Sequence, residues 1–162
     1  MFQLKLLRYE RIEKRPVVYL DESGFSADAP RGNGYSQKGK KCYGCKDWHA
    51  RGRLNAIGAI TNFKLLNVCL FDCNIDADVF YGWLTQQLLP AIAPNSVIVL
   101  DNATFHKRDD ALRAVQKQGH ILEFLPPYSP DLNPIEKKWA QAKSIRRKFG
   151  CTPEELFIYT DL

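Results

Sequence analysis

Short apolar runs, each broken off by polar or turn-forming residues, dominate the first half of the chain. Residues 17–20 are apolar at every position, which is typical of a central strand buried on both faces. Two more β-like runs, residues 54–61 and 65–71, are separated only by residues 62–64. So short a break between two strands predicts an antiparallel hairpin.

The second half of the chain first changes to a helical period and then alternates. Apolar residues recur at helical spacing over residues 76–89, where Asp76 can cap the start and Pro90 limits the end. The elements that follow are a strand, a helix closed by glycine and a strand: residues 97–100, 109–118 with Gly119, and 121–125.

Two more helix starts complete the pattern. Asn133 followed by Pro134 predicts the first, because asparagine caps helices well and proline suits the first turn. The apolar stripe of that helix is Ile135, Trp139, Ala142, Ile145 and Phe149. A capping-box pattern over residues 152–155 predicts a last helix, which we expect to be cut short.

This order of elements predicts an α/β fold. Three strands followed by alternating helices and strands imply a mixed sheet with helices packed on its faces. A chain of 162 residues has the size of one domain. We expect a short N-terminal lead-in over residues 1–16, a single domain over 17–149, and a truncated C-terminal helix over 150–162.

The net charge of +5 suits a polyanionic partner such as nucleic acid. Basic residues gather in two stretches, 31–53 and 137–148, both next to the acids considered below. The candidates for phosphate contacts are Lys40, Lys41, Lys137, Lys138, Lys143, Arg146, Arg147 and Lys148. A solvated helix face remains the alternative for those on the predicted helix.

The sequence suggests a reducing, intracellular setting. No apolar run approaches the roughly 20 residues of a membrane helix, and the N-terminus is charged too early for a secretory signal. We therefore expect a cytoplasmic protein with five reduced cysteines. Cys42 and Cys45, with Cys69 and Cys73, loosely imitate a zinc site, but their uneven spacing favours incidental thiols.

Asp21 and Asp101 each come directly after an apolar run. Side chains alternate across a strand, so Asp21 should share a face with Tyr19, and Glu22 should lie on the opposite face. If the two strands are neighbours, the aspartates converge at one end of the sheet, where a divalent cation would offset their repulsion. The alternative is that each aspartate simply ends a strand and begins a turn.

Glu136 is the third acid of interest. On its predicted helix it lies roughly 100° from Ile135, at the edge of the apolar stripe. It can therefore lean over the end of the sheet, and in the first turn it is also favoured by the helix dipole. A surface glutamate that only satisfies that dipole is the alternative.

Three stretches carry a family resemblance: residues 20–25, 97–107 and 125–136. They resemble the catalytic core of mariner-type transposases, specifically the bacterial insertion-sequence branch, often described as DDE superfamily endonucleases. Between Asp101 and Glu136 lie 34 residues, positions 102–135, which matches many members of the family. The third stretch is the most specific, because a proline-rich loop delivers a glutamate onto a helix.

The resemblance implies a ribonuclease H-like fold, a mixed five-stranded sheet with helices on both faces. The family's catalytic and metal-binding acids fall on Asp21, Asp101 and Glu136, which would hold two Mg²⁺ or Mn²⁺ ions. Asn102 and His106 lie in a matching block as supporting residues. For His106 we favour a structural or strand-positioning part over a general base, because metal-bound water needs no strong base.

The function implied is cut-and-paste transposition, with cleavage at transposon ends and strand transfer into target DNA at TA dinucleotides. The implied partners are inverted-repeat ends, target DNA, a second copy in a homodimer, and a separate or upstream helix-turn-helix region. That region is not in this sequence, and the segment with Cys42, Tyr43, Cys45 and Trp48 is unusual for the family. A split or frameshifted gene product, a decayed copy that only binds DNA or regulates, or another ribonuclease H-like nuclease remain alternatives.

Overall fold

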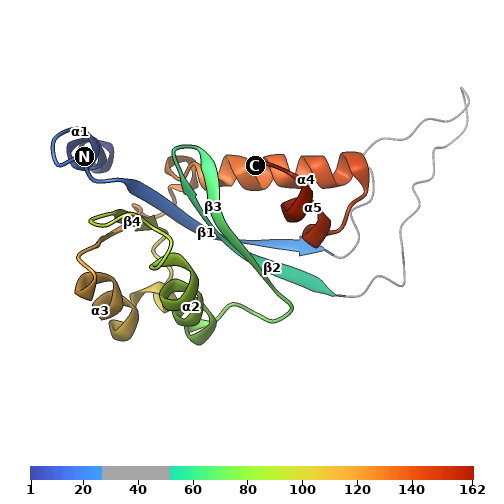
Figure 1. Cartoon of the computed structure of the whole chain (residues 1–162), viewed down its shortest axis with the longest axis horizontal. Coiled ribbons are helices and arrows are strands. Elements are labelled where there is room, and N and C mark those ends of the chain that lie inside the picture. The colour runs from blue at the N-terminus through green and yellow to red at the C-terminus, as the bar shows by residue number, and fades with distance from the viewer. Residues whose placement is uncertain (27–51) are drawn as a thin grey trace, which may run out of the picture.

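The structure, a computed structural model, describes residues 1–26 and 52–162 (Figure 1). The described residues form a five-stranded sheet in the order β3-β2-β1-β4-β5. Its strands are β1 Val17–Ser26, β2 Arg53–Thr61, β3 Lys64–Phe71, β4 Val97–Leu100 and β5 Ile121–Phe124. The first three strands are antiparallel neighbours, whereas β4 and β5 run parallel to β1. The predicted mixed sheet and its central first strand are confirmed.

Helices cover both faces of this sheet, as the resemblance implied. On one face, α2 and α3 pack with a π-helical segment, η1, over apolar residues of β1, β2 and β4. On the other, α4 and α5 cover β2 and the end of β1. The helices are α1 Phe2–Arg11, α2 Ala77–Trp83, η1 Leu84–Leu88, α3 Asp109–Lys117, α4 Ile135–Phe149 and α5 Pro153–Tyr159. Two short 3₁₀ turns, η2 Thr104–Lys107 and η3 Pro130–Leu132, lie in the connections.

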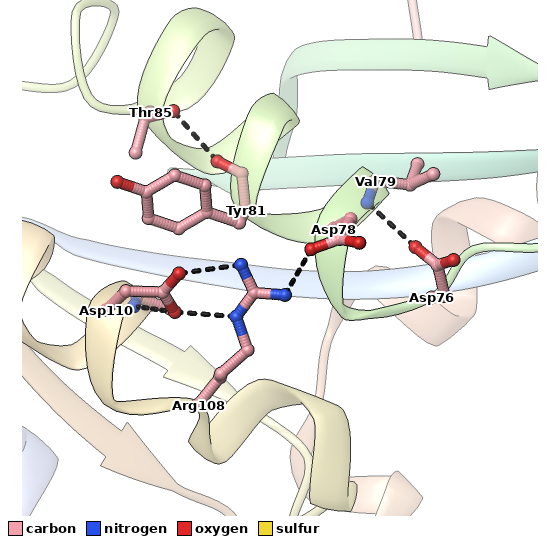
Figure 2. Close-up of polar contacts among 8 residues, drawn as sticks. Asp76, Asp78, Val79, Tyr81, Thr85, Arg108 and Asp110 are labelled. Carbon is pink, nitrogen blue, oxygen red and sulfur yellow. Dashed lines mark hydrogen bonds and ion pairs between the residues drawn. The ribbon is translucent and has the colours of Figure 1, made fainter.

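The predicted end signals of the helices are present in the structure. The Asp76 carboxylate accepts a hydrogen bond from the Val79 amide at 2.9 Å and caps α2 (Figure 2). Gly119, at φ +78°, follows α3 in the left-handed conformation that glycine tolerates best. Thr152 and Glu155 form the expected capping box of α5.

Three details differ from the sequence prediction. Residues 1–16 contain a helix, α1, which the pattern missed because only Leu6 of its residues is buried. The helix predicted at Asn133 begins at Ile135, although the Asn133 carbonyl oxygen Oδ1 still accepts from the Ile135 amide at 3.2 Å. Phe149, expected in the apolar stripe, is the last residue of α4 and is 67% exposed.

A charged bridge joins two helices on the α2–α3 face. Arg108, just before α3, donates two hydrogen bonds to the Asp110 carboxylate, at 2.7 and 2.6 Å, and a third to Asp78 of α2 (Figure 2). Its guanidinium also lies over the Tyr81 ring. The bridge is partly exposed, so its role is to orient the two helices rather than to supply much stability. Within residues 1–26 and 52–162, no helix has the length and apolarity needed to cross a membrane.

Candidate active site

Asp21 and Asp101 lie together at the same end of two parallel strands. The last residues of β1 and β4 in register are Tyr19 and Val99, and each aspartate follows two positions later. Carboxylate oxygens of the two aspartates belong to a group of acids that lie within 4.8 Å of one another. The convergence inferred from their matched positions is therefore found in the structure.

The third acid of that close group is Glu22, which sequence analysis did not select. Beyond Tyr19, β1 has no β4 residue in register with it, so Glu22 can reach past the end of β4. Its Oε1 lies 2.7 Å from Nε2 of His106. The alternation of side chains along a strand could not reveal this contact. The one feature of the sequence that pointed to Glu22 was its place as a second acid directly after Asp21.

His106 joins two acids through both of its ring nitrogens. Nε2 faces Glu22, and Nδ1 lies 2.8 Å from Oδ1 of Asp101. The side chain is only 1% exposed, and its ring packs against Phe80 and Phe105 with centroids 4.5 and 4.2 Å away. With both nitrogens engaged, this histidine has the geometry of a positioning group. It lies behind the acids and outside the cavity that they line.

The two partners of this contact shift one another's pKa. Burial alone would lower the pKa of His106, but its hydrogen bonds to Asp101 and Glu22 outweigh burial and raise the pKa to about 9. The hydrogen bond from His106 holds the pKa of Asp101 below its usual value, and the Ala103 amide assists. At neutral pH the pair is therefore a protonated imidazole against an ionised carboxylate.

Asp21 experiences the opposite electrostatic environment. Burial is the largest cause that raises its pKa, and the charges of Glu136 and Glu22 add to it, bringing the value to about 8. Such a carboxyl group keeps its proton at neutral pH unless a cation replaces it. Since carboxylate oxygens are preferred ligands of Mg²⁺ and Mn²⁺, this donor set fits a divalent cation.

Glu136 completes the set of predicted acids around one cavity. It lies in the first turn of α4 and lines a cavity of about 240 Å³ together with Asp21, Asp101 and Asn102. It does not belong to the close group within 4.8 Å, yet its charge acts on Asp21. The proline-rich loop of residues 125–130 also lines the cavity.

A glycine in the neighbouring strand lets α4 approach the sheet at this point. Gly58 of β2 is the register partner of Asp21. A Cβ atom on Gly58 would lie 2.5 Å from Cη2 of Trp139, whose indole fills the space. Because Trp139 is one helical turn after Glu136, the close approach that Gly58 permits also sets the height of Glu136 above β1.

One predicted phosphate contact must be corrected. Arg146 is only 4% exposed and donates hydrogen bonds to the backbone carbonyls of Ser26 and Cys151, at 2.9 and 3.0 Å. Its guanidinium also lies over the Phe25 ring. A side chain held in this way ties the end of α4 to the end of β1 and is unavailable to DNA.

The other basic candidates have varied surroundings. Lys137, Arg147 and Lys148 are exposed, and Lys138 is partly so. Lys143 lies over the Phe25 ring. Lys40 and Lys41, like Cys42, Tyr43, Cys45 and Trp48, lie outside the described residues. Cys69 and Cys73 are free thiols in the part of the chain that the structure describes.

Comparison with known proteins identifies the family of this chain and solved structures that share its fold. The family model described as DDE superfamily endonuclease matches residues 16–154. Among curated proteins, none matches the chain.

Solved structures of the Mos1 mariner transposase share the fold. The Mos1 paired-end complex with the left transposon end is 17% identical, with a TM-score of 0.68 over 89% of this chain and 46% of the other. The paired-end complex with Mg is also 17% identical, with a TM-score of 0.68 over 98% and 53%. The Mos1 catalytic domain is 13% identical, with a TM-score of 0.60 over 91% and 68%. The chain thus spans about half the length of the Mos1 chains in the paired-end complexes.

Proposed function

This chain belongs to the DDE superfamily of endonucleases, and on that premise we propose that it is the catalytic domain of a DNA transposase of the mariner type. The observation that carries the proposal is the meeting of Asp21, Asp101 and Glu136 at one cavity. These acids come from a strand, the position directly after a second strand, and a helix. An acidic cavity on a ribonuclease H-like sheet is suited to metal-dependent phosphoryl transfer.

The proposed cofactor is a pair of Mg²⁺ or Mn²⁺ ions. Asp21 would ligate both ions, Asp101 one of them and Glu136 the other. When bound, the ions supply an activated water and stabilise charge on the scissile phosphate. The Mos1 paired-end complexes described with Mg and with Mn support this choice of metal.

The protein's own groups would orient the acids and the DNA. His106 would hold Asp101 in place from behind, while Asn102 lines the cavity where the phosphate would enter. Lys137 and Lys138 follow Glu136 directly and would contact phosphates that flank the cut. Such contacts position a duplex without reading its sequence.

The proposed reaction is strand cleavage at the transposon ends followed by transfer of the freed 3′-hydroxyl into target DNA, at TA dinucleotides. The proposed partners are inverted-repeat ends, target DNA, a second copy of the chain and a helix-turn-helix region that reads the repeats. The proposed place of action is the bacterial cytoplasm, at the nucleoid.

Nicking of a supercoiled plasmid in Mg²⁺ or Mn²⁺ tests the nuclease assignment. We expect the chain to nick the plasmid and Asp21→Asn to abolish nicking, because the cavity loses its shared ligand. Asp72→Asn is a matched control, since Asp72 is exposed and does not line the cavity. Equal nicking by Asp21→Asn and the unsubstituted chain would remove Asp21 from the catalytic site.

A substrate panel separates transposition from the other candidate functions. The panel holds a duplex with the ends of the encoding element, an RNA–DNA hybrid and a four-way junction. We expect preferred cleavage of the element ends. Preference for the hybrid would favour a ribonuclease H, preference for the junction a resolvase, and DNA binding without any cleavage a regulatory remnant.

A further inference from the structure

The side chain of Asn133 is buried between β1 and the start of α4. It is 3% exposed and uses both ends of its amide. Nδ2 donates to the Leu20 carbonyl at 2.9 Å, and Oδ1 accepts from the Ile135 amide at 3.2 Å. Asparagine offers a donor and an acceptor on two separate atoms of one side chain, so it can bridge a carbonyl and an amide, whereas an ionised carboxylate has no donor for the carbonyl.

Each backbone group that Asn133 holds lies one residue before an acid of the cavity. Leu20 precedes Asp21, and Ile135 precedes Glu136. The backbone amide of Glu136 is also held, by the Asn133 backbone carbonyl at 3.2 Å. One residue therefore connects the chain segments that carry the strand acid and the helix acid.

At Leu20, β1 is paired with β2 but no longer with β4, so the sheet supports this part of the strand on one side only. Register between β1 and β4 ends at Tyr19 and Val99, so Leu20 has no β4 residue opposite it. Asn133 supplies a hydrogen bond at this place. Without this hydrogen bond, β1 and the start of α4 would be held together mainly by apolar packing. The carboxylates of Asp21 and Glu136, which these two elements carry, repel one another.

We propose that Asn133 is a positioning residue whose amide sets the spacing between Asp21 and Glu136 that a divalent ion requires. The inference rests on the proposed function, because it assigns these acids to one metal centre. A residue whose only role was to cap α4 would accept a hydrogen bond from the Ile135 amide but would not need to donate one to the Leu20 carbonyl.

Two substitutions separate positioning from capping. Asn133→Ser keeps a side-chain oxygen that can cap the helix, but it is too short to bridge to Leu20. Asn133→Ala removes both hydrogen bonds. Asn55→Ala is a matched control, because Nδ2 of Asn55 donates to the Cys73 carbonyl at the same 2.9 Å and Asn55 does not line the cavity.

The experiment is Mn²⁺ titration calorimetry on the whole chain, with thermal unfolding of each variant. We expect both Asn133 variants to bind Mn²⁺ about ten- to a hundredfold more weakly, as for lost support of a metal ligand. Asn133→Ser should stay folded with a somewhat lower unfolding temperature, because the Leu20 carbonyl loses its donor, and Asn55→Ala should keep full Mn²⁺ affinity.

The outcomes distinguish this inference from the proposed function. Full Mn²⁺ affinity in folded Asn133→Ser, with loss of binding in Asp21→Asn, would overturn the positioning role and leave the metal centre intact. Equal weakening by Asn55→Ala would also overturn it, because the effect would then be general destabilisation. No Mn²⁺ binding by the unsubstituted chain would overturn both proposals.

Discussion

Nε2 of His106 lies 2.7 Å from Oε1 of Glu22, and this contact fixes an imidazole ring that is almost wholly buried. The other ring nitrogen faces Asp101. The ring cannot turn without losing both partners, so Glu22 restrains Asp101 through His106. An acid outside the predicted set thereby contributes to the geometry of the cavity.

His106→Gln should weaken divalent-ion binding by about ten- to a hundredfold, because Asp101 loses the group that orients it. Mn²⁺ titration and plasmid nicking measure this effect. His120→Gln is the control, because His120 is also buried and its Nδ1 accepts from the Ser96 amide, away from the acids. Unchanged ion affinity in His106→Gln would show that Asp101 keeps its orientation unaided.

Gly58→Ala should destabilise the fold by about 1–3 kcal/mol through overpacking against Trp139. We also expect a loss of nicking larger than the stability loss explains, since α4 must move away from β1 and carry Glu136 with it. Urea unfolding and nicking rates below the unfolding transition measure the two effects.

Gly82→Ala provides the contrast for that substitution. Nothing lies within 4 Å of a Cβ atom at Gly82, and alanine favours the helical state. It should leave nicking unchanged and stability unchanged or slightly higher. If Gly58→Ala behaved in the same way, the close approach of α4 would not matter for the cavity.

The metal-free protein should lose stability as the pH rises from about 5 to about 9. Asp21 has a folded-state pKa of about 8 against an ordinary 3.8, mainly through burial, so folding favours its protonated form and this contribution disappears as pH rises. His106, with a pKa raised to about 9 by its two acids against burial, changes stability in the same direction.

Mg²⁺ should oppose this loss, because it binds the deprotonated acids. The gain in unfolding temperature on adding Mg²⁺ should therefore grow with pH across the same window, and thermal unfolding at several pH values measures it. Asp21→Asn should reduce both trends and leave the part that comes from His106. A gain that is independent of pH would mean that Asp21 is not a ligand.

Arg146→Ala and Lys137→Ala should behave differently. Arg146→Ala should cost about 1–3 kcal/mol of stability, because two backbone carbonyls lose their donor. Lys137→Ala should leave stability nearly unchanged but weaken DNA binding and reduce its salt dependence by about one counterion. Urea unfolding and binding isotherms at several salt concentrations test both statements.

The parts of the fold that sequence predicted are those governed by local pattern. The apolar run of β4 matches its observed bounds, Val97–Leu100, and Asp76 caps its helix as expected. The convergence of Asp21 and Asp101 was predicted on the condition that their strands are neighbours, and β1 and β4 are paired in the structure. The bounds of β4 and the cap at Asp76 depend on neighbours within a few residues, which is why the sequence alone predicts them.

The missed parts depend on contacts between distant segments. Glu22 reaches His106 across 84 positions of sequence, and no pattern within β1 signals that contact. Arg146 looks like a surface arginine in a basic helix, yet the end of β1 lies against it and takes its hydrogen bond. In α1, exposed Leu4 and Leu7 leave no clear apolar stripe to recognise.

The indole of Trp139 is 2% exposed, and its Nε1 has no hydrogen-bond partner among the described residues. It sits in the seam between α4 and Gly58, so its fluorescence should report whether that seam is closed. In a variant with Trp48 and Trp83 replaced by phenylalanine, a red-shifted emission would reveal water entering beneath the helix. The protein thus carries an intrinsic optical probe one helical turn from Glu136.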